Sequence, residues 1–67
     1  MKVNINSKTH ELPEKSSINQ ALKHINMSDF NGTAVAVNGE VVSKKQWNST
    51  IIKNNDKILV IRASQGG

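Results

Sequence analysis

The sequence predicts an α+β domain, a mixed sheet of four to five strands with one helix packed across one face. Three features indicate this fold: short segments of alternating or β-branched apolar residues, a single segment of helical periodicity, and turn signals between them. One helix cannot cover both faces of a sheet, so the other face is expected to remain open. With 67 residues, the chain has room for one small domain.

The N-terminal segment is expected to form a β-hairpin. Val3 and Ile5 alternate with polar residues, which is the period-2 pattern of a half-buried strand. A Ser-Lys pair at residues 7–8 is the expected tight turn, and residues 9–12 return as the second strand. Pro13 ends this strand, because proline has no N–H to donate to the ladder.

The next segment is expected to be the helix. Its apolar residues recur at i, i+3, i+4 and i+7 and would share one helical face: Ile18, Ala21, Leu22 and Ile25. Ser17 occupies the N-cap position, and Gln20, three residues later, completes a capping-box pattern. We expect the helix to end near residues 26–28, before a turn at residues 31–32.

The second half of the chain supplies the remaining strands. Residues 33–37 are apolar and β-branched, as in a central strand, and Asn38-Gly39 is the strongest hairpin signal in the chain. Residues 40–42 would pair back after this turn. Residues 57–62, with four consecutive apolar side chains, would form the last strand.

A polar segment with one large side chain lies between these strands. Residues 43–49 are expected to form a loop or one helical turn anchored by the indole of Trp47. Residues 50–52 are expected to add a short strand, and residues 54–56 a turn before the last strand.

The chain changes character after Arg62. We divide it into a domain at residues 1–62 and a flexible tail at residues 63–67, which has no large apolar side chain to bind the core. Glycine carries the largest entropic cost of ordering, and a five-residue extended tail reaches at most ~17 Å. The tail is therefore expected to bring the Gly67 carboxylate into the active site of a partner, although two terminal glycines alone can also be a simple flexible end.

The tail residues suit such a role. Gly66 and Gly67 have no Cβ and would fit a narrow channel that excludes water, with Ser64 and Gln65 behind them. A carboxylate becomes an acyl donor once adenylation gives it a good leaving group. A persulfide sulfur could then displace AMP and leave a thiocarboxylate on Gly67.

Composition argues against several other functions. The chain has no cysteine, and no paired carboxylates accompany His10 or His24, so we expect no metal site and no catalytic residue. His24 is expected at the surface, whereas the burial of His10 is left open. The nine basic residues are dispersed, and Trp47 and Phe30 are the only aromatic residues, which disfavours a nucleic-acid surface despite a net charge of +4. The absence of a long apolar run and of a signal peptide predicts a cytoplasmic protein that does not enter membranes.

Residues along the whole chain together resemble one known family. They are Val37-Asn38-Gly39 leading into Val42, then Trp47 and Ile51, then Asp56-Lys57-Ile58-Leu59-Val60, with Gly66-Gly67 closing the chain. This pattern is similar to the ThiS/MoaD group of ubiquitin-like sulfur carriers, and to the ThiS family in particular. Two positions depart from the group: Ser43 stands where proline is frequent, and Asn55 where glycine is common. The resemblance implies a β-grasp fold, with the first and last strands adjacent in the middle of the sheet.

The resemblance also implies a function in forming the thiazole ring of thiamin. In that scheme a ThiF-like enzyme uses ATP to adenylate Gly67, a cysteine-desulfurase system supplies sulfur, and the thiocarboxylate delivers it to a ThiG-like thiazole synthase. The chain would be a carrier rather than an enzyme, would bind no cofactor, and would be a monomer when alone. Alternatives are a molybdopterin-type carrier, a ubiquitin-like binding module without sulfur chemistry, and a small basic nucleic-acid binder.

The last strand is expected to expose apolar side chains on the open face. Ile58 and Val60 share one face of this strand, and analogy with ubiquitin-like folds assigns them to the helix side. Leu59 and Ile61 then lie on the open face.

An exposed apolar patch near the tail would be a docking surface for partners. Ala34 and Ala36 are expected to lie in this patch beside the last strand. The alternative is that the loop around Trp47 covers the patch. Arg62, at the root of the tail, would either contact an acidic partner or be solvated.

Overall fold

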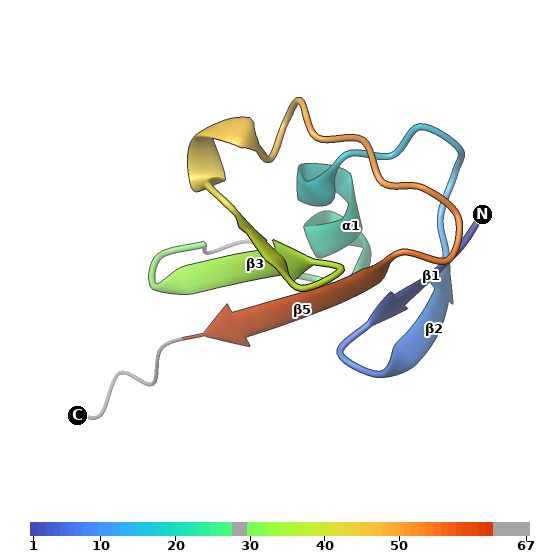
Figure 1. Cartoon of the computed structure of the whole chain (residues 1–67), viewed down its shortest axis with the longest axis horizontal. Coiled ribbons are helices and arrows are strands. Elements are labelled where there is room, and N and C mark those ends of the chain that lie inside the picture. The colour runs from blue at the N-terminus through green and yellow to red at the C-terminus, as the bar shows by residue number, and fades with distance from the viewer. Residues whose placement is uncertain (28–29, 63–67) are drawn as a thin grey trace.

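A computed structural model describes residues 1–27 and 30–62, which form one sheet and one α-helix (Figure 1). The elements are β1 (Lys2–Ile5), β2 (Lys8–Glu11), α1 (Ile18–His24), β3 (Thr33–Val37), β4 (Glu40–Val42), the 3₁₀ turn η1 (Lys44–Gln46) and β5 (Lys57–Arg62). The five strands lie in the order β2-β1-β5-β3-β4, with β1 and β5 parallel and the other pairs antiparallel. The predicted fold class is confirmed, and the first and last strands are neighbours in the middle of the sheet.

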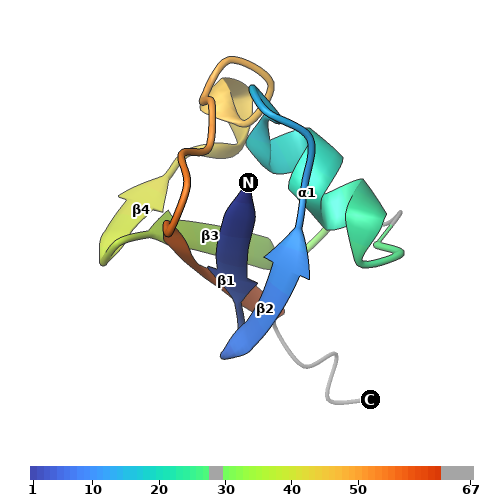
Figure 2. The ribbon, with the colours of Figure 1, turned by 90° about the vertical axis from the view of Figure 1, so that its right-hand side faces the viewer.

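The helix packs across one face of the sheet (Figure 2). Its N-terminus has the predicted capping box: Gln20 N donates to Ser17 Oγ at 3.3 Å, and Ser17 N donates to Gln20 Oε1 at 2.8 Å. The helix ends at His24, earlier than predicted, because Asn26 adopts the left-handed conformation with φ 64°. In the described part of the chain, no helix is long and apolar enough to cross a membrane.

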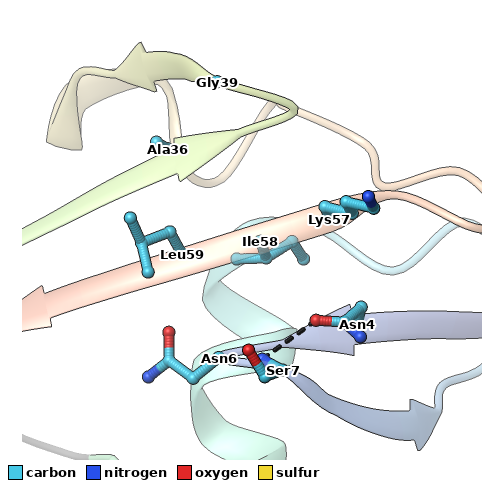
Figure 3. A pocket seen from close by; sticks show the side chains of 8 residues that line it. All are labelled: Asn4, Asn6, Ser7, Ala36, Gly39, Lys57, Ile58 and Leu59. Atoms are coloured by element: carbon cyan, nitrogen blue, oxygen red, sulfur yellow. Dashed lines mark hydrogen bonds between the residues drawn. The ribbon is translucent and has the colours of Figure 1, made fainter.

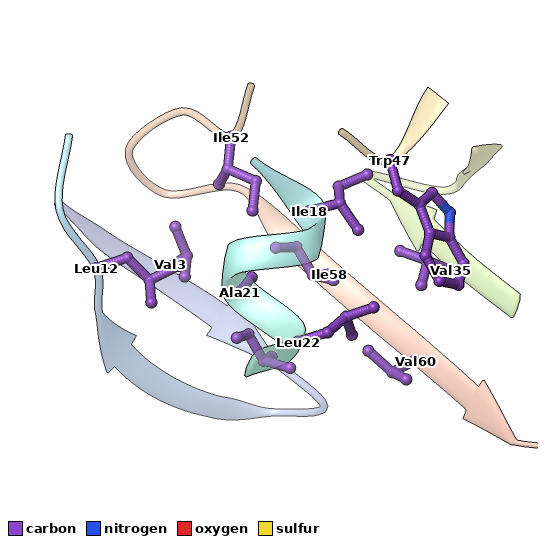
Figure 4. Close-up of a cluster of buried hydrophobic side chains, with 11 residues drawn as sticks. Val3, Leu12, Ile18, Ala21, Leu22, Val35, Trp47, Ile52, Ile58 and Val60 are labelled. Carbon is purple, nitrogen blue, oxygen red and sulfur yellow. The ribbon is translucent and has the colours of Figure 1, made fainter. Parts of the chain in front are cut away.

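Eleven buried apolar residues form the core between the helix and the sheet (Figure 4). They are Val3, Ile5, Leu12, Ile18, Ala21, Leu22, Val35, Trp47, Ile52, Ile58 and Val60. Trp47 is 1% exposed, and its Nε1 donates to the carbonyl of Val42 at 2.9 Å. The indole also contacts Phe30 edge to face, with 5.6 Å between ring centroids. The prediction that Trp47 anchors its polar segment is confirmed, and that segment contains the single turn η1.

The first hairpin turn lies one residue earlier than predicted. Asn6 and Ser7, not Ser7 and Lys8, occupy the turn, with φ of 51° and 70°, and Lys8 already pairs with Ile5. Asparagine tolerates positive φ better than lysine, which explains this register. The other turns are where they were predicted: Asn38 and Gly39 have φ of 52° and 86°. Asn55 has φ of 71°, which suits its position in a turn.

The predicted strand at residues 50–52 is not present. Only Ile51 forms an isolated bridge, with Ser17, while Ile52 N donates to Ser16 O at 2.8 Å and Ile18 N donates to Thr50 O at 3.2 Å. The segment therefore pairs with the chain at the start of α1, and Ile52 enters the core. Its β-branched residues favour an extended backbone but do not select a strand as the partner.

Candidate functional site

The face of the sheet opposite α1 carries exposed apolar side chains from β5. Ile58 and Val60 are 3% and 8% exposed in the core, whereas Leu59 and Ile61 are 50% and 52% exposed. The predicted alternation is therefore confirmed.

Neighbouring strands extend this exposed apolar surface. The register of β3 on β5 places Ala36 opposite Leu59 and Ala34 opposite Ile61, as predicted. Val41 of β4 lies opposite Ala36 and is 78% exposed. We refer to these five residues as the apolar patch: Ala34, Ala36, Val41, Leu59 and Ile61.

Sequence reasoning missed Val41. The signal was present, because Val41 and Val42 are adjacent in a strand and must point to opposite faces. Val42 is half-buried against the core and its carbonyl accepts from the indole of Trp47, so Val41 points to the open face.

The loop around Trp47 does not cover the patch, so that alternative is wrong. Trp47 packs beside Val35 in the core on the helix side of the sheet (Figure 4). Leu59 and Ile61 remain half exposed, which is unusual for large apolar side chains lying together on one surface.

Arg62 borders the patch and does not lie within it. It is exposed at the end of β5, and its partner in β3 is Thr33, which is buried. Alternation along β5 therefore directs the Arg62 side chain to the face opposite that of Ile61.

The predicted tail begins where β5 ends. Ser64, Gln65, Gly66 and Gly67 lie outside the described residues. The last described residue, Arg62, directly follows Ile61, which belongs to the patch. One residue of the patch, Ile61, therefore lies directly before the residue at which β5 ends. Figure 1 shows this end of β5 at the edge of the domain.

The two histidines lie elsewhere, on the helix side. His24 is exposed at the end of α1, as predicted, and His10, whose burial the sequence left open, is half-buried on β2. Their rings meet edge to face with 5.5 Å between centroids, a contact that the sequence did not predict. Within residues 1–27 and 30–62, no group of three or more histidine, cysteine, aspartate or glutamate side chains could hold a metal ion.

The fold and this face together define a small ubiquitin-like β-grasp domain with an exposed apolar surface beside its last strand. The model of the ThiS family matches residues 2–67, and the chain belongs to the ThiS family. Membership implies a sulfur carrier of thiamin biosynthesis, a protein substrate and not an enzyme.

Two solved structures share the fold. The crystal structure of a thiamine biosynthesis protein (ThiS) from Geobacter metallireducens is 22% identical, with a TM-score of 0.83 and 100% of each chain covered. A solution NMR structure of a thiamine biosynthesis protein from the same organism is 22% identical, with a TM-score of 0.80, 100% of this chain and 88% of the other covered. None of the curated proteins matches the chain in sequence.

Proposed function

We propose that the chain carries sulfur as a thiocarboxylate on Gly67 for synthesis of the thiazole of thiamin. The observation that carries this proposal is the family match, which extends through residue 67 and so includes Gly66 and Gly67. The names of the two structural relatives support thiamin over molybdopterin as the pathway. The apolar patch beside the root of the tail supports a carrier that docks on larger enzymes.

The tail undergoes three steps in this proposal: adenylyl transfer, acyl transfer to sulfur, and reduction. A Gly67 carboxylate oxygen attacks the α-phosphorus of ATP on a ThiF-like enzyme, which releases pyrophosphate and forms an acyl adenylate. A persulfide from a cysteine-desulfurase system attacks the acyl carbon and AMP leaves. A thiol then reduces the resulting acyl disulfide, which leaves the thiocarboxylate on Gly67 and a disulfide on the donor.

The chain's own residues position the reacting group. Leu59, Ile61, Ala34 and Ala36 form the docking face, and Arg62 contacts the partner at the root of the tail. The tail residues Ser64, Gln65 and Gly66 lie along the partner's channel, where glycine lets a narrow site close around the acyl group. A ThiG-like thiazole synthase then takes the sulfur from the thiocarboxylate, and Gly67 returns to the carboxylate form with an oxygen in place of the sulfur.

The test is the intact mass of the chain after incubation with its ThiF-like enzyme, ATP, a persulfide donor and a reducing thiol. The proposal predicts a gain corresponding to exchange of one oxygen for sulfur, which requires ATP. A variant that lacks Gly67 keeps the domain and should gain nothing. An unchanged mass of the full chain, with an enzyme shown to be active on its own substrate, contradicts the proposal.

A further inference from the structure

A hollow of about 240 Å³ adjoins the apolar patch on the open face. It lies between the β1–β2 turn and the β3–β4 turn, with the first half of β5 crossing between them (Figure 3). Small residues, Ala36 and Gly39, leave the space free on one side, and Leu59 contributes an apolar wall. Because Ala36 and Leu59 also belong to the patch, the hollow and the patch form one continuous surface.

The size of the hollow favours a side chain as its occupant. Pockets for small molecules usually enclose about 300–1,000 Å³. This hollow is smaller and lies open on a sheet face, so it would bury little of a cofactor. It would take one apolar side chain of a docked protein, as buried anchors do in protein interfaces.

Two hydrogen-bond donors flank the hollow on the side away from the patch. Asn4 and Lys57 are register partners in the parallel pair of β1 and β5. Ser7 N donates to Asn4 Oδ1 at 2.9 Å, so the NH₂ of the Asn4 amide is left to donate elsewhere (Figure 3). Lys57 is exposed, and the ion pairs among the described residues do not include it.

The carboxylate of Asp56, which precedes Lys57 in sequence, already accepts two hydrogen bonds from other groups. Asp56 Oδ1 accepts from Asn38 Nδ2 at 2.9 Å, and Asp56 Oδ2 accepts from Lys53 N at 2.8 Å. Lys57 and Asn4, register partners that both line the hollow, therefore present an ammonium and an amide donor, and each is complementary to a carboxylate.

The walls of the hollow are fixed before any partner binds. The Asn6 amide bonds the backbone of Val60 in both directions, at 3.3 Å and 2.8 Å. Asn38 holds the β3–β4 turn on β5, since Lys57 N donates to Asn38 Oδ1 at 2.9 Å. A preformed surface reduces the entropic cost of docking.

We propose that this hollow receives an apolar side chain of the adenylating partner, and that an Asp or Glu carboxylate of the same partner accepts from Lys57 and Asn4. This inference rests on the proposed function, because it names the chemistry by which the partner recognises the docking face. The apolar side chain in the hollow anchors the partner, and the carboxylate that accepts from Lys57 and Asn4 sets the partner's orientation.

Four variants test the two parts separately. Asn4→Asp keeps the acceptor for Ser7 N but replaces the free donor by an acceptor. Lys57→Glu reverses the charge and Lys57→Arg retains it, while Ala36→Leu fills the hollow. The matched control is Lys23→Glu, which reverses the charge of an exposed lysine on α1, across the sheet from the hollow.

The measurements are the dissociation constant of each variant for the ThiF-like enzyme without ATP, and the rate of pyrophosphate release with ATP. Asn4→Asp, Lys57→Glu and Ala36→Leu should each weaken binding roughly tenfold or more, as expected for loss of a charge-assisted contact or an anchor. Lys57→Arg and Lys23→Glu should bind like the parent chain. Thermal unfolding of each variant shows whether the domain itself is intact.

The outcomes separate this inference from the proposed function. If the parent chain is adenylated and the open-face variants bind as tightly, the hollow is not a recognition site and the proposed function stands. If Lys23→Glu loses as much as Lys57→Glu, the effect is general electrostatics and the inference is wrong. If the parent chain neither binds nor releases pyrophosphate, the proposed function fails and this inference fails with it.

Discussion

The side chain of Asn6 extends the parallel pairing of β1 with β5 by bonding Val60. Its Nδ2 donates to the Val60 carbonyl at 3.3 Å, and its Oδ1 accepts from the Val60 N–H at 2.8 Å. β1 itself ends at Ile5, so this amide replaces a backbone partner for the second half of β5. The strand that leads to the tail is thereby held by a residue of the first hairpin turn.

Replacing Asn6 by glycine should therefore weaken this half of β5. Asn6→Gly keeps the positive φ of 51° without strain and removes only the amide. We expect a loss of about 1–3 kcal/mol in the free energy of unfolding, since two bonds to half-buried groups disappear. Denaturant unfolding measures this loss, and hydrogen exchange should show faster opening at Val60.

The neighbouring turn residue provides the control. Ser7 has φ 70°, so Ser7→Gly relieves backbone strain in the same turn and should not destabilise the domain. If both glycine variants lose the same stability, chain flexibility and not the Asn6–Val60 contact is responsible.

The apolar patch should matter for docking and little for folding. Leu59 and Ile61 are about half exposed, so Leu59→Ala or Ile61→Ala should cost less than about 1 kcal/mol of stability. Binding to the ThiF-like enzyme should fall at least several-fold, because buried aliphatic contacts are lost in the complex only. Titration calorimetry of the enzyme with each variant gives the dissociation constants.

Ile51 is the matched control for these variants. It is 48% exposed, close to the exposure of Leu59, but it lies in the segment that bridges to Ser17 before α1. Ile51→Ala should bind as the parent does. An equal loss of binding in Ile51→Ala would mean that exposed apolar area in general, and not this patch, determines docking.

Trp47 should be essential for the domain. It is 1% exposed, bonds the carbonyl of Val42 and packs on Phe30. Trp47→Ala should destabilise the domain by about 3–5 kcal/mol, which is close to the whole stability of a small domain. Circular dichroism during thermal unfolding measures the effect, and an unchanged midpoint would contradict the packing described for the indole.

Replacing the N-cap residue of α1 should destabilise the domain less than Trp47→Ala does, and this residue lies on the face away from the patch. Ser17→Ala removes the acceptor for Gln20 N and should cost about 0.5–2 kcal/mol. At a temperature where the variant is folded, its adenylation rate should equal that of the parent chain. A slower rate would place the start of α1 in the docking surface.

Local rules predicted most of the fold from the sequence. The capping box at Ser17 and Gln20 and the helical period fixed the start and face of α1, and alternation along β5 separated Ile58 from Leu59. These features depend on neighbouring residues, which a sequence displays directly.

The misplaced or missed features depend on partners distant in sequence. Residues 50–52 have strand propensity, yet they bond the chain near Ser16 and Ser17. The contact of His10 with His24 and the hollow beside Lys57 arise only when strands and turns assemble. The strand order was predicted from the family resemblance, because no pattern among neighbouring residues in the sequence indicates that β1 pairs with β5.

The most direct test of sulfur transfer to Gly67 is fragmentation mass spectrometry of the chain after reaction with its ThiF-like enzyme, ATP, a persulfide donor and a reducing thiol. The chain has no cysteine, so the donor's sulfur has no thiol of this chain to join. We expect one oxygen of the C-terminal carboxyl of Gly67 to be replaced by sulfur. Sulfur located on any other residue, or a terminal carboxylate that stays unmodified with an active enzyme, would contradict it.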